Sequence, residues 1–218
     1  MEHNQEFFLK IYNLMDERYG EQNWWPADTA FEVVLGAILT QNTNWNNVEQ
    51  SIKNLKKEII LTPQNILNIE DEKLKDLIKP SGFYNQKAER LKIISSFIIE
   101  KLGCDIKNIK EYPLITGRRM LLNLKGVGEE TADSILLYAA DIPSFVIDKY
   151  TMRMFYRIGF DIDMKYRKYY EIFMDNLPHD VKLFKQYHAL IVENSKLFCR
   201  KKAVCKGCPL ERTCLKKY

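Results

Sequence analysis

The sequence predicts an all-α protein. Apolar residues recur at helical spacing along most of the 218 residues, in about ten stretches joined by short connections. The best strand candidate, Ser144–Ile147, is too short to build a sheet. Hydrophobic residues make up 46% of the chain and aromatic residues 12%. This composition excludes a disordered protein and allows a sizeable buried core.

The predicted helices follow in order, and capping residues mark several of their starts. Asp28 or Thr29 is suited to cap a helix through the segment FEVVLGAIL, and Thr62-Pro63 is typical of an N-cap followed by the first helical residue. Between them, one helix carries four apolar residues on a single face: Trp45, Val48, Ile52 and Leu55. The remaining helices are predicted over Ala88–Lys101, Arg118–Leu124, Glu129–Ala140, Asp148–Ile158, Lys165–Asn176 and Val181–Leu197.

Two proline-containing segments, Trp24–Asp28 and Asp141–Ser144, are the best candidates for points where the chain passes between lobes. No apolar run approaches the ~20 residues that span a bilayer, and the N-terminus lacks the pattern of a signal peptide. We therefore expect a cytoplasmic protein with no membrane partner. The net charge is +4, and residues 199–218 hold seven Lys or Arg against one acidic residue. Such a tail is either simply solvated or binds phosphate groups.

The stretch LKGVGEETA, residues 124–132, lies between two apolar helical runs. Gly126 and Gly128 predict a tight hairpin that needs glycine twice, because glycine tolerates positive φ and the close approach of another backbone. Amide groups at the start of the following helix then suit a phosphate oxygen. The alternative is an ordinary turn between helices, because the glycine spacing matches neither a Walker loop nor a dinucleotide-binding loop.

Four cysteines lie within sixteen residues, spaced C-x5-C-x2-C-x5-C: Cys199, Cys205, Cys208 and Cys214. Four thiolates from one short looped segment suit a [4Fe–4S] cluster. Zinc is the runner-up, because zinc sites commonly use two separated CxxC pairs or added histidines. No flavin or nicotinamide motif is present, so a structural role for a single cluster is favoured over electron transfer. The cluster would hold the loop in one conformation, and the basic side chains of the loop would then face the phosphates of a nucleic acid backbone. The fifth cysteine, Cys104, is expected to be structural.

The hairpin, a downstream aspartate and the four-cysteine loop together resemble the endonuclease III-like, helix-hairpin-helix DNA glycosylases over nearly the whole chain. The resemblance implies two helical lobes. A helical barrel over residues 27–142 would contain the helix-hairpin-helix motif at about 117–140, and a discontinuous lobe of residues 1–26 and 143–218 would carry the cluster loop, 199–214. Two departures are visible: Lys125 replaces the family's usual proline, and the first cysteine gap is five residues rather than six.

The same resemblance assigns a catalytic carboxylate. The segment Val146-Ile147-Asp148 matches the family's aspartate element, so Asp148 would stabilise an oxocarbenium-like sugar and orient a water. Asp148 also opens a predicted helix, where an aspartate serves as an N-cap. His188, in the middle of another predicted helix, is expected to be a packed residue rather than a catalyst.

The resemblance also implies how the chain would hold double-stranded DNA as a monomer. Leu39–Thr43 resembles the segment that supplies a polar residue to plug the duplex, here Gln41. Gly82–Ala88 resembles the loop that wedges into the duplex, here through Phe83. The hairpin would bind the DNA backbone through Lys125, Gly126 and Gly128.

One departure from the family decides the expected chemistry. Bifunctional members carry a lysine in the second hairpin helix, and its amine attacks the sugar to form a Schiff base. The matching residue here is Glu130, and a carboxylate cannot act as this nucleophile. Lys125 and Lys149 lie nearby in the sequence but do not match the family position. We therefore expect a monofunctional glycosylase, which removes a base without cutting the strand.

Aromatic residues indicate which base is removed. The run Trp24-Trp25-Pro26, together with Trp45, resembles the 3-methyladenine branch of the family. A cationic methylated purine favours a π-rich slot, in which Trp24 and Trp45 would sandwich the base and Pro26 would close one side. The alternative is that these rings are core residues.

The expected function is thus excision of alkylated purines, chiefly 3-methyladenine, in base excision repair, by a nucleoid-associated enzyme of bacterial or archaeal type. Three alternatives stay open. The chain could be a bifunctional glycosylase and lyase acting on oxidised pyrimidines, a monofunctional enzyme for a mismatched normal base, or a non-enzymatic helix-hairpin-helix DNA-binding module.

Overall fold

The computed structural model describes residues 4–160 and 162–216, and the regular structure of this part of the chain is entirely helical. The predicted all-α class is confirmed. The elements are α1 Gln5–Tyr19, α2 Ala30–Leu39, α3 Trp45–Glu58, α4 Pro63–Asn68, α5 Asp71–Ile78, η1 Lys79–Ser81, α6 Tyr84–Leu102, η2 Ile106–Glu111, α7 Leu114–Leu122, α8 Glu129–Ser134, η3 Ile135–Ala139, α9 Lys149–Ile158, α10 Tyr166–Asn176 and α11 Val181–Leu197. Among the described residues, no helix combines the length and hydropathy that crossing a membrane requires.

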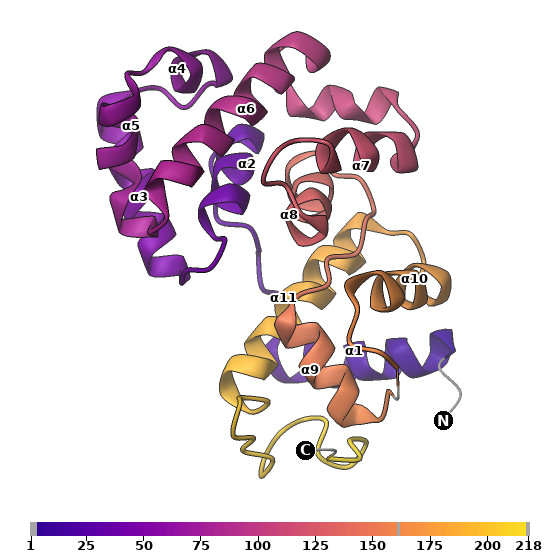
Figure 1. Cartoon of the computed structure of the whole chain (residues 1–218). Helices are drawn as coiled ribbons and strands as arrows, with labels where there is room; N and C mark the ends of the chain where they lie inside the picture. The colour runs from indigo at the N-terminus through magenta and orange to yellow at the C-terminus, as the bar shows by residue number, and fades with distance from the viewer. Residues whose placement is uncertain (1–3, 161, 217–218) are drawn as a thin grey trace. The chain divides into compact units, whose positions relative to one another are not determined.

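The chain divides into two compact units. One consists of Met1–Trp24 with Pro143–Tyr218, here called the terminal unit, and the other is Trp25–Ile142, the middle unit. The terminal unit contains α1, α9, α10, α11 and the C-terminal loop, and the middle unit contains α2 to α8 (Figure 1). Trp25 and Pro26 therefore belong to the middle unit, two residues before the boundary expected from the sequence.

Helix α2 forms the centre of the middle unit. Every residue from Phe31 to Leu39 is buried, and the helix packs against α3, α6 and η3. Its N-cap is Thr29, whose hydroxyl accepts a hydrogen bond of 3.1 Å from the Glu32 amide. Of the two predicted caps, Thr29 is therefore the one used. The predicted cap and first residue of α4, Thr62 and Pro63, are confirmed as well.

Helices α7 and α8 form the predicted hairpin of the middle unit. The Arg118 guanidinium on α7 binds the buried Asp133 carboxylate on α8 through two bonds, Nε to Oδ1 at 2.8 Å and Nη2 to Oδ2 at 2.9 Å. Such bidentate pairs fix geometry as well as charge. The predicted helix Glu129–Ala140 is interrupted: α8 ends at Ser134, and the chain continues as a π-helical turn over Ile135–Ala139.

Helix α11 forms the centre of the terminal unit, and α1 and α9 pack on it. Aromatic rings fill this core; Phe145 and Phe173 have ring centroids 4.3 Å apart, and Phe8 lies 4.9 Å from Phe173. Burying each ring contributes about 1.5–3 kcal/mol. The strand candidate Ser144–Ile147 is buried here without forming a strand. The amides of Phe145 and Ile147 instead bond to the side chains of Met174 and Tyr166.

The sequence did not predict α1 and α5. Helix α1 buries Phe8, Ile11 and Met15, but charged residues interrupt this pattern. Helix α5 has only eight residues, and two of them are buried. Helices this short or this polar depend on tertiary packing, because they are marginal in isolation.

Candidate functional site

The turn between α7 and α8 requires glycine once rather than twice. Gly126 has φ +84°, and a Cβ there would overlap the Arg90 side chain packed against it. Gly128 has φ −92° and open space where a Cβ would lie, so other residues could adopt its conformation. As the N-cap of α8, Gly128 supplies no side-chain acceptor. The first-turn amides of α8 therefore have no side-chain cap and suit an external anion.

Gln41 is hydrogen-bonded to the hairpin. Its Nε2 donates to the Gly126 carbonyl and to the Thr131 hydroxyl, both at 3.0 Å. Its Oε1 accepts a bond of 2.5 Å from Arg90 Nη1. The predicted plugging residue thus links the turn after α2 to the hairpin and to α6.

Phe83 lies at an exposed bend directly before α6. Its side chain is 61% exposed, and its backbone is left-handed with φ +48°. Bulky residues rarely adopt this conformation, which costs about 1–2 kcal/mol. An exposed ring on a strained backbone adds little to core packing.

The charged residues near the hairpin are largely exposed. Lys125 Nζ lies 2.5 Å from Glu89 Oε1. The Lys125 side chain is 71% exposed and the Glu89 side chain is 50% exposed. Such pairs are worth about 0–1 kcal/mol. Glu130 is exposed in the first turn of α8. Lys149 is exposed in the terminal unit, directly after Asp148.

Asp148 is buried at the start of α9, where it serves as the N-cap. Its Oδ1 accepts bonds from the Thr151 amide at 2.7 Å and the Thr151 hydroxyl at 2.8 Å. Its Oδ2 faces the imidazole of His188 on α11, with Nε2 at 3.6 Å. One carboxylate oxygen therefore caps the helix, while the other lies next to a histidine.

The surroundings of Asp148 keep the carboxyl group ionised. Burial favours the neutral acid, but the neighbouring His188 and the two bonds from Thr151 outweigh it, so the pKa of Asp148 lies below its ordinary range. A buried carboxylate of this kind can stabilise positive charge that develops beside it and can orient a water molecule.

The four predicted pocket residues are divided between the two units. Trp24, in the terminal unit, packs edge-on against His188 with centroids 5.8 Å apart, and Lys196 Nζ lies 5.7 Å from its ring centroid. Trp24 thereby extends the group formed by Asp148 and His188. Trp25 and Trp45, in the middle unit, pack edge to face at 5.4 Å. Pro26, also in the middle unit, is exposed.

Trp25 is half-buried and packs against other aromatic rings. Besides Trp45, its ring packs against Tyr138 at 5.4 Å. A Cβ added at Gly36 would come within 3.1 Å of the Trp25 indole, so the glycine leaves room for the ring.

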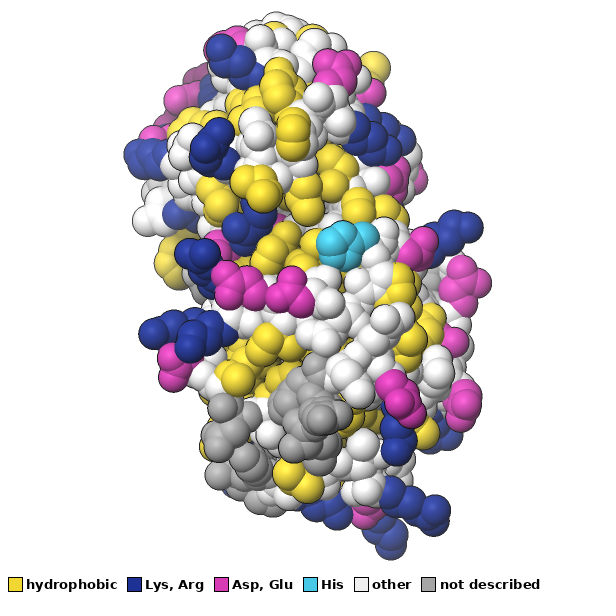
Figure 2. Space-filling model, turned by 90° about the vertical axis from the view of Figure 1, so that its right-hand side faces the viewer, with side chains coloured by type: hydrophobic (Ala, Val, Ile, Leu, Met, Phe, Trp, Pro, Cys, Tyr) yellow, Lys and Arg dark blue, Asp and Glu magenta, His cyan; other side chains and the backbone are white. Residues whose placement is uncertain are grey.

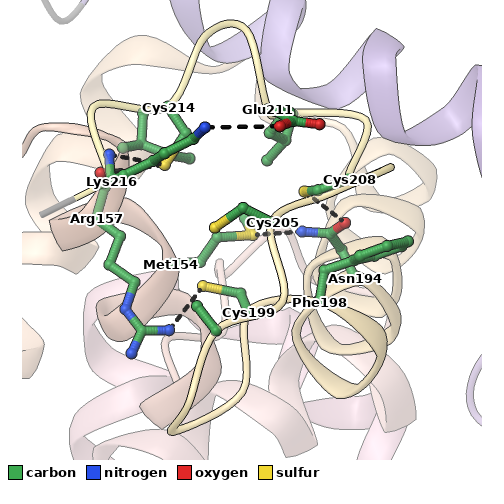
Figure 3. A pocket seen from close by; sticks show the side chains of 13 residues that line it. Met154, Arg157, Asn194, Phe198, Cys199, Cys205, Cys208, Glu211, Cys214 and Lys216 are labelled. Atoms are coloured by element: carbon green, nitrogen blue, oxygen red, sulfur yellow. Dashed lines mark hydrogen bonds and ion pairs between the residues drawn. The ribbon is translucent and has the colours of Figure 1, made fainter. Parts of the chain in front are cut away.

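The four C-terminal cysteines line one pocket of the terminal unit (Figure 3). Arg157 lies beside the pocket, where Nη1 contacts Cys199 Sγ at 3.4 Å and Nη1 and Nη2 donate to the carbonyls of Arg200 and Lys201 at 2.6 and 2.9 Å. Burial raises the pKa of the Cys208 and Cys214 thiols. A cationic centre in the pocket would reverse this preference and favour the thiolates.

The cysteine pocket offers four sulfur donors to a metal centre. In the described chain, no three Cys, His, Asp or Glu side chains converge closely enough to hold one ion. A zinc site needs its thiolates about 2.3 Å from a single point. Four thiolates can also hold a cluster of several iron atoms.

Basic side chains of the cysteine loop are exposed: Arg200, Lys201, Lys202, Lys206 and Arg212. On the face shown in Figure 2, Lys and Arg lie among acidic and apolar side chains and form no single continuous basic patch.

The comparison with protein families decides the identity. The family model of the HhH-GPD superfamily, base excision DNA repair proteins, matches residues 35–179. The chain belongs to this superfamily. It is a DNA glycosylase of the HhH-GPD type, and the resemblance inferred from the hairpin and the cysteine loop is confirmed at this level.

Several known proteins are similar to this HhH-GPD chain. A protein of Methanocaldococcus jannaschii that carries the provisional name of DNA repair glycosylase is 53% identical over 218 residues, 99% of each chain. The crystal structure of the H. pylori 3-methyladenine DNA glycosylase bound to 1,N6-ethenoadenine has a TM-score of 0.76 and 32% identity, and covers 89% of this chain and 98% of that one. A non-covalent endonuclease III–DNA complex shares the fold, with a TM-score of 0.81 at 20% identity over 98% of this chain and 96% of that one.

Three residues to which the sequence assigned no role in the site lie beside the predicted HhH-GPD site residues. His188, expected only to be packed, is both buried and next to Asp148. Arg90 contacts Gln41, which is 49 residues away in sequence, and Lys87 is buried beneath the turns that carry Gln41 and Phe83. No local sequence pattern predicts such contacts, since they form only when distant segments fold together.

Proposed function

We propose that this HhH-GPD protein is a monofunctional DNA glycosylase that hydrolyses the N-glycosidic bond of alkylated purines, chiefly 3-methyladenine. The observation that carries the proposal is the buried, ionised Asp148 in a chain that has Glu130 where lyase members carry lysine. The carboxylate suits hydrolysis by water, and the missing amine argues against attack on the sugar by the protein.

Asp148 would act on the sugar. A cationic N-methyl purine is already a good leaving group, so little acid assistance is required. As the bond to the base breaks, positive charge develops on the sugar ring, and the carboxylate would stabilise this charge and orient a water for attack at C1′. Thr151 would hold one oxygen of the carboxylate in place, so that its orientation is set before the substrate arrives.

The choice of an alkylated purine rests on two observations. The H. pylori relative named as a 3-methyladenine DNA glycosylase is 32% identical over 89% of this chain. The Trp24 ring lies next to His188 and so belongs to the surroundings of Asp148. An aromatic face favours a cationic base by about 0.5–2 kcal/mol.

The DNA backbone would be held without sequence readout. The first-turn amides of α8 and the cations of the cysteine loop would bind phosphates. Gln41 and Phe83 would fill the space that the damaged nucleotide leaves as it moves out of the stack. Extrusion costs a few kcal/mol, and less where alkylation has weakened the pairing.

We also propose that the four cysteines hold a [4Fe–4S] cluster. When bound, this group would act as a structural staple that neutralises the thiolates and keeps the loop folded. Arg157 would assist, because its guanidinium contacts Cys199 and holds two carbonyls of the loop. The exposed loop cations would then be held in a fixed arrangement toward DNA.

The proposal is tested by identifying the bases that the protein releases. Methylated duplex DNA is incubated with the protein, the free bases are separated by chromatography, and strand nicking is scored in parallel. We expect 3-methyladenine to be released without nicking. Duplexes with G·T and G·U mismatches and with oxidised pyrimidines serve as comparison substrates.

Other outcomes would point to a different function. Preferential release from a mismatch duplex would support a monofunctional enzyme for normal or deaminated bases. A covalent protein–DNA adduct after borohydride reduction would show an amine nucleophile and contradict the hydrolytic mechanism. DNA binding with no base release from any duplex would indicate that the protein is a non-enzymatic DNA-binding module.

A further inference from the structure

Lys87, in the first turn of α6, is fully buried at 0% exposure. Its Nζ donates to the Leu39 carbonyl at 2.8 Å and to the Ser81 carbonyl at 2.6 Å. Leu39 is the last residue of α2, and Ser81 is the last residue of η1. Each carbonyl lies two residues before a predicted DNA-contact residue, Gln41 in one case and Phe83 in the other.

The ammonium group of Lys87 is stabilised by these two carbonyls. The carbonyls at helix C-termini carry partial negative charge, so two helix ends together can hold a buried cation. Burial and the nearby Arg90 lower the pKa of Lys87 to about 8. Lysine is therefore retained at a position where an apolar residue would avoid burying a charge.

Arg90 lies one turn further along α6 and makes a second set of contacts. Its Nη1 donates to Gln41 Oε1, and its side chain packs against Gly126 in the hairpin turn. Gln41 in turn donates to the Gly126 carbonyl. Arg90 therefore joins the Gln41 side chain to the hairpin, whereas Lys87 joins the Gln41 turn to the Phe83 loop.

We propose that Lys87 and Arg90 are positioning residues that hold three DNA-contacting segments, the Gln41 turn, the Phe83 loop and the hairpin, as one rigid surface at the start of α6. The inference rests on the proposed function, because it takes Gln41 and Phe83 to act on the duplex. The three segments lie far apart in the sequence. A common attachment would keep Phe83 and Gln41 in a fixed position relative to the hairpin, which is proposed to bind a phosphate. A misplacement of about 1 Å can cost about 100-fold in rate.

The first test uses the protein without DNA. Hydrogen exchange is compared for the wild-type chain, K87M, R90M and the control K101M, which alters an exposed lysine in the last turn of the same helix. We expect K87M to speed exchange in both the Gln41 turn and the Phe83 loop. R90M should speed exchange in the Gln41 turn and the hairpin but leave the Phe83 loop unchanged. If K87M affects neither segment, or only one of them, the inference is overturned.

The second test separates positioning from general loss of structure. Excision is measured on two duplexes, one with the lesion paired and one with the lesion opposite an abasic site, where no pairing has to be broken. K87M and R90M should lose about 10- to 100-fold on the paired lesion and much less on the abasic duplex. Equal losses on both duplexes would indicate a merely structural role and contradict the proposal.

The two tests also distinguish this inference from the proposed function. If wild-type protein releases no base, the proposed function fails, while the exchange pattern still decides whether Lys87 and Arg90 couple the three segments. R90K provides a rescue variant, because a lysine can restore one donor to Gln41. If K87M does not fold, R90M carries both tests, since the Arg90 side chain is only half-buried.

Discussion

The imidazole Nε2 of His188 lies 3.6 Å from Oδ2 of Asp148, and both side chains are buried. The other oxygen of this carboxylate is held by Thr151 at the start of α9. One aspartate thus has a capping oxygen and an oxygen paired with histidine. This division allows helix capping and catalysis to be separated by substitution.

Asp148→Asn should keep the fold and DNA binding while excision falls about 10²–10⁴-fold. Asparagine caps helices as well as aspartate does, so α9 should stay capped, but the charge that stabilises the sugar is lost. Excision is measured in single-turnover assays and DNA affinity in parallel. The matched control is Asp180→Asn at the N-cap of α11, where the side chain accepts a bond from Leu183 at 2.7 Å and excision should not change. Unchanged excision in the Asp148 variant would refute the catalytic role.

The low pKa of Asp148 predicts a dependence of stability on pH. Because the folded-state pKa lies below the unfolded value of about 3.9, Asp148 stabilises the fold above that value. This stability is lost as the pH falls through the folded pKa. His188→Gln removes a cause of the low pKa, so the variant should lose less stability on acidification than the wild-type protein does. Urea unfolding at neutral and acid pH measures the free energy of unfolding of both proteins. Equal losses of this free energy on acidification would exclude the effect.

Phe83→Gly should leave the free energy of unfolding unchanged or raise it by up to ~1 kcal/mol, because glycine relieves the left-handed strain and little burial is lost. Excision from duplex DNA should nevertheless fall by about tenfold or more, since the wedge that offsets a few kcal/mol of extrusion is gone. Ile60→Ala removes another exposed apolar side chain, 77% exposed, and should affect neither property. A variant that lost stability and kept full excision would show that Phe83 has only a packing role.

Asp133→Asn should destabilise the middle unit by about 3–5 kcal/mol. The substitution leaves the Arg118 guanidinium, whose side chain is only 18% exposed, without its buried carboxylate. Chemical denaturation measures the change. Glu171→Gln breaks the exposed pair with Arg167, 2.7 Å apart, and should change stability by no more than about 0.5 kcal/mol. Similar effects in the two variants would mean that the buried pair does not anchor the hairpin.

Cys208→Ser should lower the iron and sulfide content of the purified protein and its visible absorbance, whereas Cys104→Ser should leave all three unchanged. Cys208 lines the pocket with the other three cysteines, while Cys104 is an exposed residue of the middle unit. Loss of the cluster should also weaken DNA binding and flatten its salt dependence, as the loop cations lose their arrangement. Stoichiometric zinc without iron in the wild-type protein would support the runner-up.

Much of the secondary structure was predictable, because it depends on residues close in sequence. Thr62-Pro63 starts α4, and the apolar face of Val48, Ile52 and Leu55 is buried in α3. Helices α1 and α5 were not predicted, because charged residues interrupt their short apolar faces. The expected need for Gly128 was wrong, since only Gly126 has a positive φ and a side chain packed against it.

The sequence by itself determined the helical class, the four-cysteine loop, the hairpin and the acidic residue at the lyase position, because each is written in residue type and local spacing. Only the tertiary structure decided that His188 lies against Asp148, that Trp25 packs against Tyr138, and that Lys87 and Arg90 join separate turns. These contacts depend on which distant side chains share a buried space, and that is settled by packing and the need to satisfy buried polar groups.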